Sequence, residues 1–445
     1  MLRFRVNLPL TLALAGFVLA GAAVGAAVGQ STPTTDGYAA TTSDDLAPLS
    51  AVAQIGRLMF FDAALSGSGK MSCASCHDPA NHYAPSNDLA VQLGGPHLDL
   101  PGRRAVPTLT YKLLTPAFTV GPSLDGDNDS IVQGQLSGTP HAAGKAATTT
   151  PDLVPQGGMF WDGRDDTLQE QPLGPLLSPF EMANASKAAL FATLKARPYA
   201  KTLEQLFGAQ VMTDQNFMIS EAAFALARYQ IEEPSFHPFT SKYDYYLAGK
   251  AKLTADEAAG LRLFNNPNKG DCNACHLDTV DASGNPPMFT DYEYEALGVP
   301  RNDKIPANAD PNYFDLGICG PMRTDPYAHQ AANCGLFKTP TLRNVASRHV
   351  FFHNGVFTSL EDVVRWYVDR DTDPARFYPR AKDGGVLKFN DLPWQYRGNI
   401  DVIDAPLDRH PGQQPALDDR EIAQVVAFLR TLTDGYAADG QAAAR

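Results

Sequence analysis

Cys73-Ala74-Ser75-Cys76-His77 sets two thiols two residues apart, with a histidine directly after the second thiol. This pattern is typical of a c-type haem attachment site, in which the thiols form thioether bonds and the histidine binds the iron. A single pentapeptide of this kind is also compatible with a disulfide, half of a zinc site or chance. The second half of the chain repeats it at Cys272-Asn273-Ala274-Cys275-His276. The repetition predicts two covalently attached haems, with His77 and His276 as iron ligands.

A helical pattern precedes each motif. The apolar side chains of residues 46–61 fall on one helical stripe, formed by Val52, Ile55 and Met59. Before the second motif, Thr254 and Glu257 have the spacing of a capping box that begins a short helix. Helix, turn and haem motif therefore occur twice, which predicts two cytochrome c-like domains.

Three further segments, 220–231, 358–367 and 418–432, have helical periodicity. Thr358 and Glu361 have the spacing of a capping box at the start of the second of these helices. No run favours a sheet. We therefore expect a mostly α fold with long loops.

The first 30 residues have the pattern of a secretory signal peptide, with two arginines followed by a long apolar run. An uncleaved membrane anchor is the alternative, because the run is long enough to span a bilayer. Export to the periplasm would agree with c-type haem, which is attached outside the cytoplasm. Residues 40–249 would then form the N-terminal domain with the first haem, and residues 250–435 the C-terminal domain with the second.

The composition and charge limit the classes of molecule that the protein is expected to bind. The chain has 445 residues and a formal net charge of −13, and no basic cluster stands out. Nucleic-acid binding is therefore not expected, whereas an acidic surface suits a partner with a positive patch. Cys319 and Cys334 lie outside the haem motifs in a loop rich in glycine and proline. In an oxidising compartment they are expected to form a disulfide, and two free thiols are the alternative.

The other face of each haem decides its chemistry. An iron with a sixth protein ligand passes electrons, whereas an open position allows reaction with a substrate. His82 and His97 are the nearest candidates for the first haem. Met322, His353 and Tyr367 are the candidates for the second. A structural role is the alternative for each.

Cleavage of a peroxide requires a group that moves a proton from the near oxygen to the departing one. A carboxylate can do this, and the segment that contains Trp161, Gln171 and Glu181 offers one. Periodicity alone leaves Glu181 equally compatible with a surface position.

The chain resembles the di-haem cytochrome c peroxidase/MauG family over nearly all of its length beyond the signal. Both haem motifs carry the resemblance, together with four further segments, namely Trp161-Asp162-Gly163-Arg164, the Gln171 and Glu181-Met182 pair, residues 337–344 and Phe352-His353-Asn354-Gly355. The combination is far more specific than two haem pentapeptides.

The resemblance implies a division of labour between the haems. The first would be the peroxidatic haem, and Glu181 matches the family's distal glutamate that promotes cleavage of the O–O bond. Gln171 matches the companion amide of that pocket. Trp161 corresponds to the tryptophan between the haems. The second haem would receive electrons and forward them.

Two positions bear on the subtype. Fourteen residues after His353, peroxidases of the family carry a methionine that binds the second haem, whereas MauG-like proteins carry a tyrosine. Tyr367 stands there, which implies a phenolate ligand and favours a bis-ferryl oxidant. His97 matches the position of the distal histidine that closes the first haem in resting peroxidases, and a loop histidine that leaves the iron open is the alternative.

The family also binds calcium between its domains, partly through an asparagine. Ala105 stands at that position, and Arg348-His349-Val350 departs from the usual Thr-x-Pro. A calcium site is therefore not expected unless backbone carbonyls and water form it. The acidic run at residues 125–129 lacks a closing glutamate, which favours a solvated loop over a calcium loop.

The resemblance favours a periplasmic peroxidase that reduces hydrogen peroxide with electrons from a small redox protein, such as a cytochrome c or a cupredoxin. One alternative is a MauG-like oxidase that oxidises residues of a partner protein, which Tyr367 supports. Another is a di-haem electron carrier, which Glu181 argues against. Trp366 and Trp394 are candidate relay residues, although burial in the core is the favoured interpretation of each. Members of the family often form homodimers.

Overall fold

The structure, a computed structural model, describes residues 48–122, 153–281 and 283–437. The predicted signal peptide and the acidic run at residues 125–129 lie outside these residues. Within the described part, no helix is both long and apolar enough to cross a membrane.

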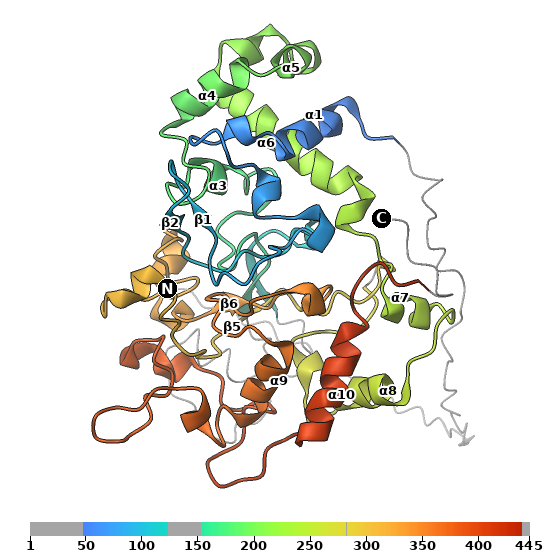
Figure 1. The fold of residues 1–445 in the computed structure, drawn as a ribbon, viewed down its shortest axis with the longest axis vertical. Coiled ribbons are helices and arrows are strands. Elements are labelled where there is room, and N and C mark those ends of the chain that lie inside the picture. The colour runs from blue at the N-terminus through green and yellow to red at the C-terminus, as the bar shows by residue number, and fades with distance from the viewer. Residues whose placement is uncertain (1–47, 123–152, 282, 438–445) are drawn as a thin grey trace, which may run out of the picture. The chain divides into compact units, whose positions relative to one another are not determined.

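Helices and short 3₁₀ turns dominate the described residues, and strands are few (Figure 1). The α-helices are α1 (Ala51–Phe60), α3 (Leu173–Leu177), α4 (Lys187–Lys195), α5 (Ala200–Phe207), α6 (Gln215–Glu232), α7 (Lys242–Leu247), α8 (Ala255–Phe264), α9 (Leu360–Asp369) and α10 (Asp419–Arg430). Three two-stranded antiparallel sheets pair β1 (Leu93–Gly94) with β2 (Leu100–Pro101), β3 (Thr119–Pro122) with β4 (Leu153–Gln156), and β5 (Tyr294–Glu295) with β6 (Phe337–Lys338). This content agrees with the predicted mostly α fold.

Helix α1 packs against α6, and the two lie side by side in Figure 1. Ser50 caps α1 by accepting a hydrogen bond from the Ala53 amide, as N-cap serines commonly do. The predicted stripe is confirmed, because Ile55 and Met59 are buried. At the crossing, a Cβ on Gly56 would lie 1.9 Å from the Ala225 carbonyl oxygen. Only glycine therefore allows this close approach.

The second half builds the same crossing from α8 and α10. The predicted capping box of Thr254 and Glu257 is present at the start of α8. A Cβ on Gly260 would lie 1.9 Å from the Gln424 carbonyl oxygen, the same distance as at Gly56. The internal repeat thus includes the haem motif, the helix before it and the crossing of that helix with a later one.

Two hydrophobic cores correspond to the two halves. One gathers residues between Ile55 and Phe236, and the other gathers residues between Tyr243 and Leu432. The sequence had placed the segment around Tyr243 in the N-terminal domain. In the structure, Tyr243 of α7 packs against Phe289 and Phe428 and so belongs to the second core. The division into domains at residues 40–249 and 250–435 stays a proposal.

Two local expectations are wrong. Ser359, not Thr358, caps α9, because its side chain accepts the hydrogen bond from the Asp362 amide. Trp394 is 81% exposed, whereas the sequence favoured burial, and Trp366 is fully buried as expected. For α10, the cap is a box formed by Asp418 and Glu421.

The predicted disulfide between Cys319 and Cys334 is confirmed. It closes a loop of sequence separation 15, for which chain entropy gives about 3 kcal/mol of stabilisation. The neighbouring Ile318 and Leu336 belong to a third small core, which also contains Leu392. The disulfide therefore anchors a loop that has little regular structure of its own.

Candidate active site with two haem cavities

The first Cys-x-x-Cys-His motif folds into a 3₁₀ turn that directs His77 into a cavity. The turn, η3 (Cys73–Ser75), is closed by the His77 amide, which donates to the Cys73 carbonyl at 2.9 Å. His77 Nδ1 lies 3.1 Å from the Tyr83 carbonyl oxygen. Because a carbonyl only accepts, Nδ1 carries the proton and Nε2 keeps its lone pair for a metal. Burial lowers the pKa of His77 to about 4, so the ring is neutral, as a ligand must be.

The second motif repeats this geometry. Its turn, η8 (Cys272–Ala274), is closed by the His276 amide, which donates to the Cys272 carbonyl at 2.8 Å. His276 Nδ1 lies 2.9 Å from the Phe289 carbonyl oxygen, and burial lowers the pKa of His276 to about 4. Both histidines are therefore held in the tautomer that frees Nε2.

A cavity lies beside each motif. The first is lined by Cys73, Cys76 and His77, and Gln171 and Glu181 share its wall. Gln171 precedes the short helix α3 and Glu181 follows it, so α3 brings both side chains to one cavity. The residues that the sequence grouped as a peroxide pocket thus lie together with the first haem motif.

The backbone around Glu181 is anchored on both sides. Its carbonyl accepts a hydrogen bond from the Gly95 amide at 2.8 Å, and the next residue, Met182, is buried. A Cβ on Gly94 would lie 2.3 Å from the Phe180 carbonyl oxygen, so glycine in β1 lets the two segments approach. This close approach explains how a glutamate between two apolar residues is fixed in place.

Glu181 is exposed because it faces the open cavity, yet neighbouring protein atoms remove much of its water. This desolvation raises the pKa of Glu181, and the Ser178 hydroxyl and the charge of Arg164 oppose the rise only in part. The pKa of Cys76 rises to about 11, mainly because the thiol is desolvated and secondly because the charge of Glu181 lies near it. The carboxyl group therefore acts electrostatically on the first haem motif.

The second cavity is lined by Cys272, Cys275 and His276, together with Tyr367 and His353. Burial raises the pKa of Tyr367 above its usual value, and the two cysteines add to the rise. Tyr367 therefore lies close to the attachment motif, on the wall of the same cavity. Tyr367 comes from α9, within the helix that the sequence predicted over residues 358–367.

Trp161 lies on the wall of both cavities. Its Nε1 donates to the Ala105 carbonyl at 2.9 Å, and the Ala105 amide donates to the His353 carbonyl at 2.7 Å. The neighbouring Asp162 is completely buried, and its carboxylate lies 2.8 Å from Arg104 Nη1. The Trp161 indole is therefore held by the hydrogen bond of its ring nitrogen and by the ion pair of the next residue, Asp162.

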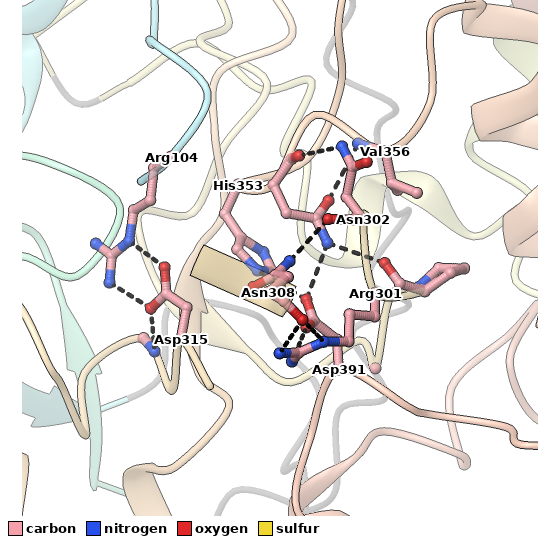
Figure 2. A network of polar contacts seen from close by, with 12 residues as sticks. Arg104, Arg301, Asn302, Asn308, Asp315, His353, Val356 and Asp391 are labelled. Carbon is pink, nitrogen blue, oxygen red and sulfur yellow. Dashed lines mark hydrogen bonds and ion pairs between the residues drawn. The ribbon is translucent and has the colours of Figure 1, made fainter. Parts of the chain in front are cut away.

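Two groups of polar contacts lie near the second cavity, one of Arg104 with Asp315 and one around Asp391 (Figure 2). Arg104 makes a bidentate contact with Asp315 and lies over the Phe337 ring at 5.4 Å. Phe337 stacks on His353 with 3.6 Å between ring centroids. His353 Nε2 lies 3.8 Å from Asp391, which Arg301 holds from the other side at 3.2 Å.

The other candidates for a sixth haem-iron ligand do not lie where the sequence placed them. Met322, considered for the second haem, lines the first cavity. His97 is exposed, and neither His97 nor His82 lies on the described lining of the cavities. The placement gives no support to either histidine as a ligand of the first haem. At the position considered for calcium, the Arg348 guanidinium donates to the Val106 carbonyl at 3.1 Å, and calcium binding stays untested.

The residues present fit a covalently attached haem in each cavity. Each motif offers two half-buried thiols that form no disulfide, and desolvation raises the pKa of Cys73 and Cys272 to about 12. His353 Nε2 is buried and has no hydrogen-bond partner within the described part of the chain, as expected where a bound group supplies one. His77 and His276 would be the axial ligands.

Sequence reasoning missed a set of cations at these cavities. Lys112 and Lys338 line both, and Arg348 lines the second. The sequence shows Lys338 within the segment 337–344 but does not indicate that it lies on the wall of both cavities. Lys112 carried no signal, because only packing brings it to the site.

Comparisons with known proteins agree with this geometry. Residues 50–252 match a family described as di-haem cytochrome c peroxidase. The chain is 33% identical to the methylamine utilization protein MauG of Paracoccus denitrificans over 408 residues, covering 89% of this chain and 92% of that protein. It is 28% identical to the cytochrome c551 peroxidase of Nitrosomonas europaea over 316 residues, covering 70% and 71%. The crystal structure of the diheme peroxidase BthA from Burkholderia thailandensis superposes with a TM-score of 0.74 at 39% identity, covering 89% of this chain and 91% of that one.

The fold and the paired cavities define a protein built around two Cys-x-x-Cys-His sites. The chain belongs to the di-haem cytochrome c peroxidase/MauG family. The predicted resemblance is thus confirmed, and the family implies two c-type haems. Relatives named peroxidase and relatives named MauG both match, which identifies the chain as a peroxidase-type oxidoreductase without separating the two activities.

Proposed function

We propose that this protein is an exported peroxidase that reduces hydrogen peroxide to water at the first haem. The observation that carries the proposal is that Glu181 and Gln171 lie on the wall of the cavity that contains His77. Each turnover consumes one peroxide, two electrons and two protons and releases two waters. When bound, the haems supply the iron that binds peroxide and the electron transfer.

The chain's own residues handle the proton and the orientation. The Glu181 carboxylate accepts the proton from the peroxide oxygen nearer the iron and delivers it to the departing oxygen. The Gln171 amide donates a hydrogen bond that orients the peroxide. The raised pKa of Glu181 suits a group that must both accept and release a proton. The exposed position of His97 supports a first haem that stays open to peroxide.

Trp161 lies between the two cavities, which supports electron delivery from the second haem to the first. The donor would be a small redox protein with a positive patch, because the chain carries a formal net charge of −13. The disulfide between Cys319 and Cys334 supports export to an oxidising compartment such as the periplasm.

Stoichiometric peroxide added to the fully oxidised protein tests this function through its absorption spectrum. A peroxidase should return to the starting spectrum within the mixing time when a reduced donor is present, and peroxide should be consumed continuously. An oxidised spectrum that persists for minutes in the presence of the donor would contradict the proposal and support the protein-oxidising alternative. Absence of any spectral change would identify an electron carrier.

The alternative that oxidises a partner protein has one observation in its favour, the position of Tyr367. Its phenol lines the second cavity close to the attachment motif, where a tyrosinate ligand would favour more oxidised iron. This alternative shares the first cavity and the Glu181 chemistry. It differs in what supplies the electrons.

Tyr367→Phe tests whether the phenol binds iron. We expect the visible spectrum of the second haem to change in the oxidised protein, because the variant removes the oxygen ligand and leaves the ring. Tyr378→Phe is the matched control, since the Tyr378 hydroxyl donates to the Gly298 carbonyl at 2.7 Å and Tyr378 lies outside both cavity linings. Identical spectra for wild type and Tyr367→Phe would reduce Tyr367 to a packing residue.

A further inference from the structure

The two cavities share part of their wall. Pro107, Lys112, Trp161, Lys338 and Pro340 line both. Two of these five residues are lysines, which are rarely placed in a protein interior without a partner. A shared basic wall is unexpected in a chain whose formal net charge is −13.

Lys112, Lys338 and Arg348 form a cluster of cations at this wall. Lys338 is 7% exposed, and its ammonium donates to the Gly158 carbonyl. Arg348 donates to the Val106 carbonyl. Burial, and then the charge of Arg348, lowers the pKa of Lys112 to about 8, while burial and then Lys112 lower the pKa of Lys338. The three charges therefore lie near enough to repel one another.

Asp162, whose charge raises the pKa of Lys338, is already paired with Arg104 and Arg164. Lys338 and Arg348 donate to the backbone carbonyls of Gly158 and Val106, respectively. Two acidic residues on the second cavity's wall are engaged elsewhere, since Asp315 binds Arg104 and Asp391 binds Arg301. Buried charges are normally paired, so the cluster favours binding of an anion from outside the polypeptide.

We propose that Lys112 and Lys338, with Arg348 beside them, form a common site for the propionate carboxylates of both haems. The inference rests on the two-haem assignment within the proposed function, and it is independent of peroxide turnover. A haem carries two propionates, and a lysine ammonium offers three donors, enough to bind a carboxylate from each side of the wall. The haems would then be joined by a pair of shared charges in addition to Trp161.

A shared charge has an electrical consequence. A cation near a haem favours the reduced iron, which carries one positive charge fewer than the oxidised iron. Loss of one shared lysine should therefore lower the reduction potential of both haems. Loss of a lysine that contacts one haem alone would shift the reduction potential of that haem only.

Potentiometric titration of the haem-loaded protein, without peroxide, tests the proposal. We expect both midpoints to shift to lower potential in Lys338→Met and to stay close to wild type in Lys338→Arg. Lys201→Met, an exposed lysine of α5 outside both cavity linings, is the matched control and should leave both midpoints unchanged. If Lys338→Met does not fold, Lys112→Met, at a half-buried position, should give the same paired shift.

Unshifted midpoints, or a shift of one midpoint only, in a variant that carries both haems would overturn the shared site. A haem-loaded crystal structure gives a second readout, in which propionate oxygens should lie within about 3 Å of the lysine nitrogens. If both midpoints shift in Lys338→Met but the wild-type protein does not consume peroxide, the proposed function is contradicted and this inference stays intact.

Discussion

Glu181→Gln should lose about 10²–10⁴-fold in the rate of peroxide turnover, the range that a positioned acid–base group contributes. The amide has nearly the same shape as the carboxylate and can still accept a hydrogen bond. It cannot take a proton from one peroxide oxygen and deliver it to the other. The loss should therefore appear in kcat as well as in kcat/KM, measured with peroxide as the varied substrate and a reduced cytochrome c as donor.

A matched control separates this effect from a general disturbance. Glu204→Gln makes the same substitution in α5, outside both cavity linings, and should leave turnover unchanged. The absorption spectra of Glu181→Gln and wild type should agree in the oxidised state. Undiminished turnover in Glu181→Gln would refute the acid–base role.

The pH profile provides an independent signature of Glu181. The reactive form is the carboxylate, so turnover should fall as the pH drops through the pKa of the group. Because desolvation by the surrounding protein atoms raises that pKa, the fall should begin at a higher pH than for an ordinary glutamate. Glu181→Gln should lack this limb of the profile, since an amide does not titrate.

The parts of the site that could be predicted are those whose chemistry is contained in a short stretch. The haem motif fixes its own turn through the amide of His77 and the carbonyl of Cys73, so five residues predict both the fold and the cofactor. The caps are similarly local, and the one error, Thr358 for Ser359, arose because adjacent residues can both accept the hydrogen bond. Glu181 was recognisable from the family resemblance but not from periodicity.

The parts that could not be predicted depend on packing between distant segments. Lys112 and Lys338 meet at one wall, although nothing in either sequence neighbourhood indicates the other. Trp394 is exposed because of how its loop packs, which hydrophobicity alone does not show. The pairing of Arg104 with Asp315 spans 211 residues, and no local pattern specifies it.

Arg104→Met should destabilise the protein by about 3–5 kcal/mol, the usual effect of removing one partner from a buried ion pair. Arg104 is nearly buried and contacts Asp162 at 2.8 Å and Asp315 at 2.6 Å. Methionine fills much of the space but leaves Asp315 without its bidentate partner and Asp162 with Arg164 alone. The loss should appear as a lower midpoint of guanidinium unfolding. Arg365→Met is the control, because its partners Asp419 and Glu361 are exposed and such pairs contribute about 0–1 kcal/mol.

The pH dependence of this loss distinguishes a charge effect from a packing effect. Burial alone would raise the pKa of Asp162, but Arg104 and Arg164 hold it below its usual value. In wild type the pair therefore stabilises the fold above the pKa of an unfolded aspartate, and the contribution disappears as the pH falls through the lower folded value. In Arg104→Met the Asp162 carboxylate is buried with less compensating charge, and protonation removes that cost. The difference in unfolding free energy between the variant and wild type should therefore shrink on acidification toward pH ~4. A difference that stays constant between neutral and acidic pH would show that Arg104 acts by filling space. Since Asp162 follows Trp161 directly, a charge effect would mean that the same ion pairs that stabilise the fold also hold the indole between the two cavities.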